Sequence, residues 1–585
     1  MCGIAGLALA NDAPPPEPAV LATMLRALGH RGPDGFAGAI AGQVALGHRR
    51  LAVIDVAGGI QPLVAGDTVM VANAEIYNYA ELRAELPAID FTTGSDCESA
   101  LHLWRDRGPP FTASLRGMYA MAIYDRGTDV LTLCRDPFGI KPLYIAKIPG
   151  GTAFASEPRA LLAAGLARRE LRQQARAELL QMQFTVGRTT IFPDIQRVLP
   201  GEMIRISNGV VSARDTAAIL PDAGPEKMRE AEALRHLEHA LMESIELHLR
   251  SDVPVGLFLS GGIDSATVLA CLARQQAQVP AYTAGYDAPG AVDERREAAR
   301  LAKSVGFEHI PVTVTETATL RHLPAIAACM DDPAADYAMI PAWFLARRAR
   351  EDVKVVLSGE GGDELFAGYG RYRTAVRPWW RGGHRMRDRG TFAGLDVLWN
   401  DLPDWRNNWA AVEGAAQPGH TRLQAAQAAD IAEWLPNDLL LKLDRCLMAH
   451  GVEGRTPLLD RAVAGAAFRL PDNLKVRRGT GKYLLRRWLA KALPKARARA
   501  PKQGFSVPVG SWIGQHGARF GDLMAALPCV QEVADPGHVR ALFRAAAGRR
   551  QSLAAWSLLF YALWHRVHIE QMATDADVFD FLAAK

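Results

Sequence analysis

Residues 253–274, VPVGLFLSGGIDSATVLACLAR, contain an apolar run, a glycine-containing turn and an apolar helical pattern in direct succession. They predict a strand at 253–259 and a helix from 264 to 274. The same rhythm continues along the chain, with expected strands at 281–286, 309–314 and 353–357 and expected helices at 293–305 and 341–350. Such alternation predicts an α/β doubly wound parallel sheet, with ligands at the carboxyl ends of its strands.

The sequence before this region has a different pattern. Short alternating or apolar runs broken by glycine favour a largely antiparallel β domain over about the first 150 residues; they lie at 43–46, 69–73, 119–124 and 130–134. Residues 207–226 are rich in turn formers and indicate a linker, followed by a helical pattern at 227–249. Because 585 residues exceed what one core usually holds, we expect two domains, at 2–206 and 227–570.

Composition excludes several classes of protein. The 67 Lys and Arg nearly balance the 63 Asp and Glu, so no nucleic-acid partner is expected. The most apolar stretch, 553–564, falls short of the roughly 20 residues that span a bilayer and predicts a buried helix. The first residues do not resemble a secretory leader, which favours the cytoplasm. Seven scattered cysteines without a Cys-x-x-Cys pair indicate neither a disulfide framework nor a zinc site.

Two loops of the parallel sheet carry chemistry. The first, Ser260-Gly261-Gly262-Ile263-Asp264-Ser265, offers backbone N–H groups and a helix start to phosphate, although a plain glycine turn is the alternative. It lacks the Gly-Lys-Ser/Thr ending of the common NTPase loop. The second loop, 358–369, follows another strand and brings acidic side chains to the same edge, so it is either a catalytic loop or an acidic surface turn.

Cys2 is a candidate nucleophile. Removal of Met1 would give it a free α-amine with a pKa of about 7.7–8.0, against about 8.5 for the thiol, so the amine could accept the thiol proton. A cysteine at position 2 is weak evidence by itself, but four polar motifs punctuate the same β region. They are HRGPD at 30–34, GHRRL at 47–51, NAEIYN at 73–78 and GSD at 94–96.

Together these motifs resemble the class II glutamine amidotransferases. The resemblance implies an α+β N-terminal nucleophile hydrolase domain, with an antiparallel sheet sandwich between helices. It implies Cys2 as nucleophile, with an oxyanion hole from the Asn73 side chain and the Ala74 N–H. Glutamine would be bound by Arg50, Glu75 and Asp96. The family usually has glycine at position 74, and alanine would be strained there if the site needs a positive φ.

The second half resembles the asparagine synthetase C-terminal domain, an ATP-pyrophosphatase. The string SGEGGDELFAGY at 358–369 carries the resemblance, and further motifs lie at 444–460, 481–486 and 502–505. It implies that Asp264 and Asp363 hold Mg²⁺, that Glu360 orders ammonia and accepts its proton, and that Lys482 neutralises phosphate charge. The implied ATP and pyrophosphate site comprises Leu259, Ser260, Gly261, Gly262, Asp264, Ser265, Ser358, Gly359 and Lys482.

The combined resemblance implies synthesis of asparagine from aspartate, ATP and glutamine-derived ammonia through a β-aspartyl adenylate. An amidotransferase of the same build that acts on another carboxylate is an alternative, and a nucleotide-sensing scaffold with inactive sites is another. The implied partners are the small substrates glutamine, aspartate and ATP, with neither nucleic acid nor membrane, and a homodimer is compatible with the sequence. Residues 371–430 show the poorest resemblance, and their Arg and Trp cluster favours a solvated insertion over a nucleic-acid surface.

Overall fold

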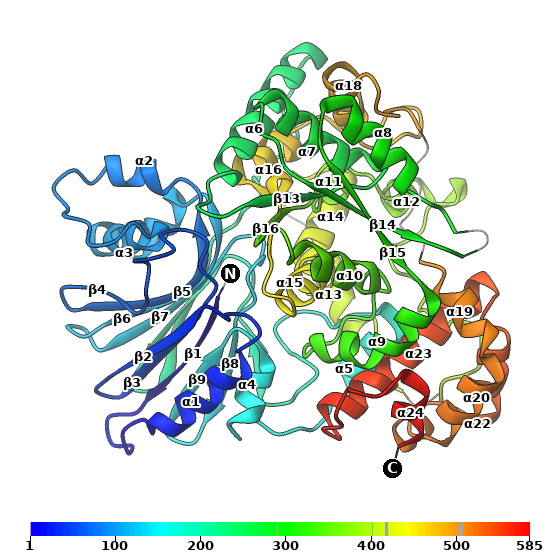
Figure 1. The fold of residues 1–585 in the computed structure, drawn as a ribbon, viewed down its shortest axis with the longest axis horizontal. Coiled ribbons are helices and arrows are strands. Elements are labelled where there is room, and N and C mark those ends of the chain that lie inside the picture. Colours follow the sequence, from blue (N-terminus) through cyan, green and yellow to red (C-terminus); the bar gives the residue numbers. More distant parts are fainter. Residues whose placement is uncertain (1, 289–290, 401, 416–418, 501–506, 585) are drawn as a thin grey trace.

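The alternating runs of the first part of the chain form two antiparallel six-stranded sheets (Figure 1). The computed structural model describes residues 2–288, 291–400, 402–415, 419–500 and 507–584. One sheet has the order β10 (Ile195–Arg197), β8 (Tyr144–Ile148), β9 (Gly151–Ala155), β1 (Gly3–Leu9), β3 (Val44–Arg50), β2 (Gly35–Ala41). The other has the order β12 (Val210–Thr216), β11 (Glu202–Ser207), β7 (Val130–Arg135), β6 (Gly117–Asp125), β5 (Thr68–Ile76), β4 (Leu63–Ala65).

The two sheets pack face to face between helices. Ile4 of β1, Val71 of β5 and Leu133 of β7 share one buried cluster between the sheets. Helix α1 (Pro18–Ala27) covers the outer face of the first sheet, and α3 (Asp96–Arg107) covers that of the second. The expected sheet sandwich between helices is confirmed.

The second part of the chain contains a five-stranded parallel sheet. Its order is β15 (His309–Val314), β14 (Ala281–Tyr286), β13 (Val255–Phe258), β16 (Val355–Leu357), β17 (Glu453–Arg455). Strands β14 and β15 lie on one side of β13, and β16 and β17 lie on its other side. The strand order therefore reverses between β13 and β16. This confirms the doubly wound sheet, and sheets of this kind bind ligands at the carboxyl ends of the strands where the order reverses.

Helices cover both faces of this sheet. One face packs against α6 (Glu230–His248), α7 (Ile263–Arg274) and α18 (Tyr483–Ala492), and the other against α10 (Met339–Ala349) and α15 (Leu440–Met448). Further along, the apolar stretch 553–564 lies in α23 (Arg549–His568), which packs on α5 (Gln173–Met182) and α9 (Glu316–Cys329) and is buried as expected. Within the described ranges, no helix combines the length and apolarity needed to cross a membrane.

Two features differ from the sequence-based expectations. The expected linker at 207–226 begins with a hairpin, because Asn208 and Gly209 both adopt positive φ and turn β11 into β12. The sheet therefore continues past residue 206. The Arg-rich segment is only partly a solvated insertion: Trp379 is 81% exposed, but Arg371 donates to the buried Asp430 carboxylate.

Candidate functional site

Cys2 lies directly before β1, where its thiol is buried. Its backbone N–H donates to Asn73 Oδ1 at 3.0 Å, and its Sγ lies 3.8 Å from the Leu51 carbonyl oxygen. Burial raises the pKa of the Cys2 thiol. A nucleophilic thiolate here therefore needs a base to take the proton.

The neighbouring Asn73 presents a free donor. Its side chain is fully buried on β5, and its Oδ1 is used by Cys2, which fixes the orientation of the amide. Its Nδ2 is buried and has no hydrogen-bond partner among the described residues. An orphaned buried donor beside a candidate nucleophile is what an oxyanion hole requires.

The Ala74 N–H faces the same open edge of the sheet. Strand β4 covers β5 only as far as Met70, and beyond it the Ala72 and Ile76 N–H groups donate to side chains instead of a strand. Backbone N–H groups along a strand alternate in direction with a period of two residues. The Ala74 N–H therefore points the same way as the N–H groups of residues 72 and 76. Ala74 is paired with Tyr119 inside the strand and is not among the positive-φ residues, so alanine is unstrained here.

The candidate glutamine-binding residue Asp96 borders this edge, and the candidate Arg50 is held by a loop next to it. The Asp96 carboxylate accepts from the Ile76 N–H at 2.6 Å, and burial raises its pKa to about 6. The Arg50 guanidinium, at the end of β3, donates to the Asp55 and Val56 carbonyl oxygens at 2.6 and 3.0 Å. The Asp55 side chain also accepts the Gly94 N–H at 2.8 Å, which joins the loop that holds Arg50 to the segment that carries Asp96.

Glu75 has a partner that its motif does not reveal. Its Oε2 lies 3.0 Å from Arg455 Nη2 on β17, a strand of the parallel sheet. Arg455 also pairs with Glu453 at 2.7 Å, and all three side chains are buried. Burial raises the pKa of Glu75 well above its ordinary value. Glu75 therefore joins the Cys2 site to the parallel sheet.

Arg31 forms a second connection between the Cys2 site and the second part of the chain, and its motif does not predict this role. Its Nε donates to the Cys2 carbonyl oxygen at 3.0 Å, and its two Nη atoms form a bidentate pair with Asp444 at 2.7 and 3.0 Å. It also donates to Glu157 at 2.7 Å. Arg31 lies in the motif at 30–34 and Asp444 in the motif at 444–460. Their positions in these motifs are the features of the sequence that could have pointed to this contact.

The two loops of the parallel sheet meet at its order reversal. The Ser260 and Ser265 hydroxyls are 2.9 Å apart and brace the turn between β13 and α7. A Cβ added to Gly359 would lie 2.8 Å from the Ser265 nitrogen, so only glycine permits this approach. The structure thus brings together the loop residues predicted from two distant motifs.

Lys482 completes this cluster. It precedes α18, and its Nζ lies 2.5 Å from Asp264 Oδ2 and 2.7 Å from Asp363 Oδ1. Although burial opposes it, the two carboxylates raise the pKa of Lys482. Two hard carboxylate oxygens that converge on one cation form a donor set that also fits Mg²⁺ with substrate phosphates. The motif at 502–505 lies outside the described residues.

Glu360 lies between this cluster and a second charged group. Burial raises the pKa of Glu360, and the Lys442 charge opposes that rise. Lys442 is itself buried and pairs with Asp336 at 2.6 Å. A carboxylate with a raised pKa suits proton acceptance near neutral pH.

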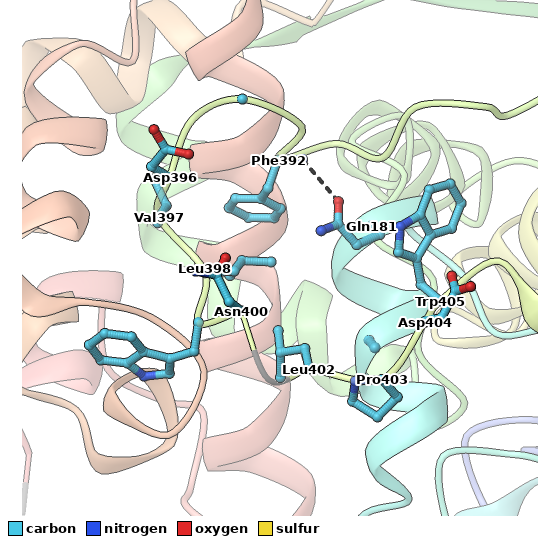
Figure 2. Close-up of a pocket in the computed structure, with 13 residues that line it drawn as sticks. Gln181, Phe392, Asp396, Val397, Leu398, Asn400, Leu402, Pro403, Asp404 and Trp405 are labelled. Carbon is cyan, nitrogen blue, oxygen red and sulfur yellow. Dashed lines mark hydrogen bonds between the residues drawn. The ribbon is translucent and has the colours of Figure 1, made fainter.

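A cavity of about 280 Å³ lies elsewhere (Figure 2). It is bounded by α5 and by residues within 392–400 and 402–405, and the Phe392 N–H donates to Gln181 Oε1 at its rim. None of the predicted site residues lines it, so it is separate from both sites.

Comparisons with known proteins match both parts. A family model described as asparagine synthase matches residues 236–566, and one described as glutamine amidotransferase domain matches 1–216. "Asparagine synthetase [glutamine-hydrolyzing] 1" of Bacillus subtilis is 31% identical, over 98% of this chain and 97% of that protein. "Asparagine synthetase B [glutamine-hydrolyzing]" of Escherichia coli is 29% identical, over 83% of this chain and 79% of its own length.

Proposed function

This chain belongs to the asparagine synthase family, and on that premise we propose that it makes asparagine from aspartate, ATP and ammonia released from glutamine. The observation that carries the proposal is the pairing of two sites in one chain. Cys2 lies beside the orphaned Asn73 donor, and Lys482 lies with two carboxylates at the reversal of the parallel sheet.

At the first site, the Cys2 thiolate attacks the side-chain amide carbon of glutamine. The Asn73 Nδ2 and the Ala74 N–H stabilise the negative charge that develops on the amide oxygen. The base returns the thiol proton to the amide nitrogen, which leaves as ammonia while the thioester forms, and water then hydrolyses the thioester to give glutamate and the free thiol. The α-amine exposed by removal of Met1 is the base, Arg50 binds the α-carboxylate and Asp96 the α-ammonium, and Glu75 orients the substrate from its contact with Arg455.

At the second site, a β-carboxylate oxygen of aspartate attacks the α-phosphorus of ATP, and the bond to pyrophosphate breaks. The loops at 259–265 and 358–359 hold the phosphates, and Lys482 neutralises their charge. Asp264 and Asp363 would hold Mg²⁺, which supplies further charge neutralisation on pyrophosphate. Ammonia then attacks the acyl carbon, AMP leaves with one aspartate oxygen, and Glu360 accepts the proton from nitrogen.

A product balance tests the proposal. With glutamine, aspartate and ATP, asparagine, AMP and pyrophosphate should form in equal amounts, and ¹⁸O from the β-carboxylate should appear in AMP. Cys2→Ala should abolish synthesis from glutamine and preserve synthesis from ammonium salt. ATP turnover with another carboxylic acid but none with aspartate would overturn the proposal.

The remaining expectations concern assembly and location. A homodimer, a cytoplasmic location and the absence of a nucleic-acid partner stay predictions. Light scattering of the purified full chain measures the first, and fractionation of cells measures the second.

A further inference from the structure

A stripe of charged and aromatic side chains leads away from Glu360 along one helical path. Asp430 and Trp434 lie in the π-helical segment η3 (Asp430–Leu439), which runs directly into α15. Asp438 and Lys442 continue a spacing of four residues, close to one turn of either an α- or a π-helix, and the charges of Lys442 and Arg387 both act on Asp438. Such π-helical turns are frequent at functional sites. The stripe therefore joins the Lys442 end, near Glu360, to the 371–430 segment.

Arg387 reaches this stripe from that segment. Its guanidinium lies 4.2 Å from the Trp434 ring centroid and 4.9 Å from those of Phe184 and Trp409. Its nearest carboxylate contact is a long one, 4.0 Å to Asp430 Oδ1, because Arg371 pairs with Asp430 at 2.7 Å. The aromatic rings hold the guanidinium in position without using its N–H donors in the plane.

Two groups on this path, a guanidinium and a carboxyl group, have unused hydrogen-bonding capacity. The Nε and Nη2 of Arg387 are buried and have no hydrogen-bond partner within the described part of the chain. The same holds for both carboxylate oxygens of Asp438, whose side chain is fully buried. Burial, and then the Asp336 charge, raise the pKa of Asp438 well above its ordinary value, so a cation bound beside it is what keeps it in the carboxylate form. Groups of this kind are costly unless something else binds them.

We propose that Arg387 and Asp438 recognise the amino-acid head group of the acceptor, Arg387 binding its α-carboxylate and Asp438 its α-ammonium. A guanidinium fork matches a carboxylate with two hydrogen bonds, and a carboxylate matches an ammonium. The side-chain carboxylate of the acceptor then extends along the stripe towards Glu360. This inference rests on the proposed function and gives the 371–430 segment a role in substrate recognition.

Two aspartate analogues test each contact separately. β-Alanine is aspartate without the α-carboxylate, and succinate is aspartate without the α-ammonium. With saturating ATP and ammonium salt, pyrophosphate release by the wild-type protein should prefer aspartate over both analogues by about 100-fold or more in kcat/KM. Arg387→Met should remove the preference over β-alanine, and Asp438→Asn should remove the preference over succinate, with little change in kcat/KM for the matching analogue.

The controls separate recognition from folding. Arg389→Met removes an exposed arginine from the same segment and should change none of these ratios. Arg387→Lys should restore part of the preference, and glutaminase activity reports on folding because it belongs to another site. Equal loss for aspartate and both analogues, or a wild-type protein without discrimination, would overturn the inference. If the wild-type protein shows no aspartate-dependent pyrophosphate release, the proposed function itself fails.

Discussion

The Asn73 side chain uses its Oδ1 in a hydrogen bond with Cys2, while its Nδ2 has no partner among the described residues. Its Oδ1 accepts the Cys2 N–H at 3.0 Å, so its Nδ2 is directed by a bond that already exists. Such preorganisation stabilises developing charge without the cost of turning a donor during the reaction.

Asn73→Ala should therefore lower kcat for glutamine hydrolysis by about 100- to 1000-fold, which is the usual cost of one oxyanion-hole donor. KM for glutamine should change little, since the donor acts mainly on the transition state. Release of glutamate measures the effect, and ammonium-dependent synthesis is the control. A variant that raised KM and kept kcat would show that Asn73 binds the ground state.

The Asp96 carboxylate should make ligand binding depend on pH. With its pKa raised to about 6, Asp96 is protonated below that value in the free protein and cannot pair with an α-ammonium. Inhibition by the product L-glutamate, which keeps its ammonium charge, should weaken about tenfold per pH unit below about 6 and level off above it. Asp96→Asn should bind weakly at every pH between 5 and 8. A pH dependence that survives in this variant would assign the titration to another group, such as Glu75.

At the scale of elements, two loops and one helix start define the nucleotide site. A Cβ on Gly368 would lie 1.9 Å from Asp363 Oδ1 and 2.2 Å from Lys482 Cε. The glycine is thus required by the ion pair, since its backbone does not have a positive φ.

Gly368→Ala should displace Asp363 and Lys482 and abolish pyrophosphate release. Glutaminase activity should persist, because the clash is confined to the synthetase loops. Gly465→Ala is the matched control: it lies in helix α16 (Arg461–Phe468), and its added Cβ meets no atom within 4 Å. If both variants retain normal synthesis, the close packing around Asp363 is not needed for activity.

The sequence predicts elements well where burial is apolar. Strands β14 and β15 have the predicted bounds, because β14 is buried along its whole length and β15 pairs with it residue for residue at the edge of the sheet. Strand β17, Glu-Gly-Arg, escapes the same analysis because its buried charges pair with each other and with Glu75. Strand β12 escapes because one edge of its sheet is exposed and its sequence is polar.

The sites were predictable only as separate motifs. The residues at the Cys2 site and those of the two synthetase loops come together as their motifs imply. The contact of Glu75 with Arg455 could not be predicted, since it depends on how two separately folded sheets meet. Arg387 could not be distinguished from a surface arginine by its sequence, because its contacts with Trp434 and Asp430 depend on how distant segments pack together.

At the scale of the whole molecule, buried ion pairs join the two parts of the chain. Arg31 binds both Asp444 and the Cys2 carbonyl oxygen, while Arg445 pairs with Asp331 at 2.8 Å and lies 3.5 Å from Glu157. These side chains are almost inaccessible to solvent, so the ion pairs replace the hydration that their charges have lost. The position of Cys2 therefore depends on a residue of α15.

Asp444→Asn tests that dependence across the interface. It removes one partner of a buried pair, a change that typically costs about 3–5 kcal/mol, so the unfolding temperature should fall. Because Arg31 loses its bidentate anchor and also holds the Cys2 carbonyl, glutaminase kcat should fall severalfold even without aspartate and ATP. Lys354→Met is the matched control: it breaks the 2.9 Å pair with Asp34, which also bridges the two parts but is about one quarter exposed. A pair of that kind contributes about 0–1 kcal/mol, so both readouts should stay near wild type. Equal effects from the two substitutions would mean that the interface acts as a whole and that Arg31 has no special hold on Cys2.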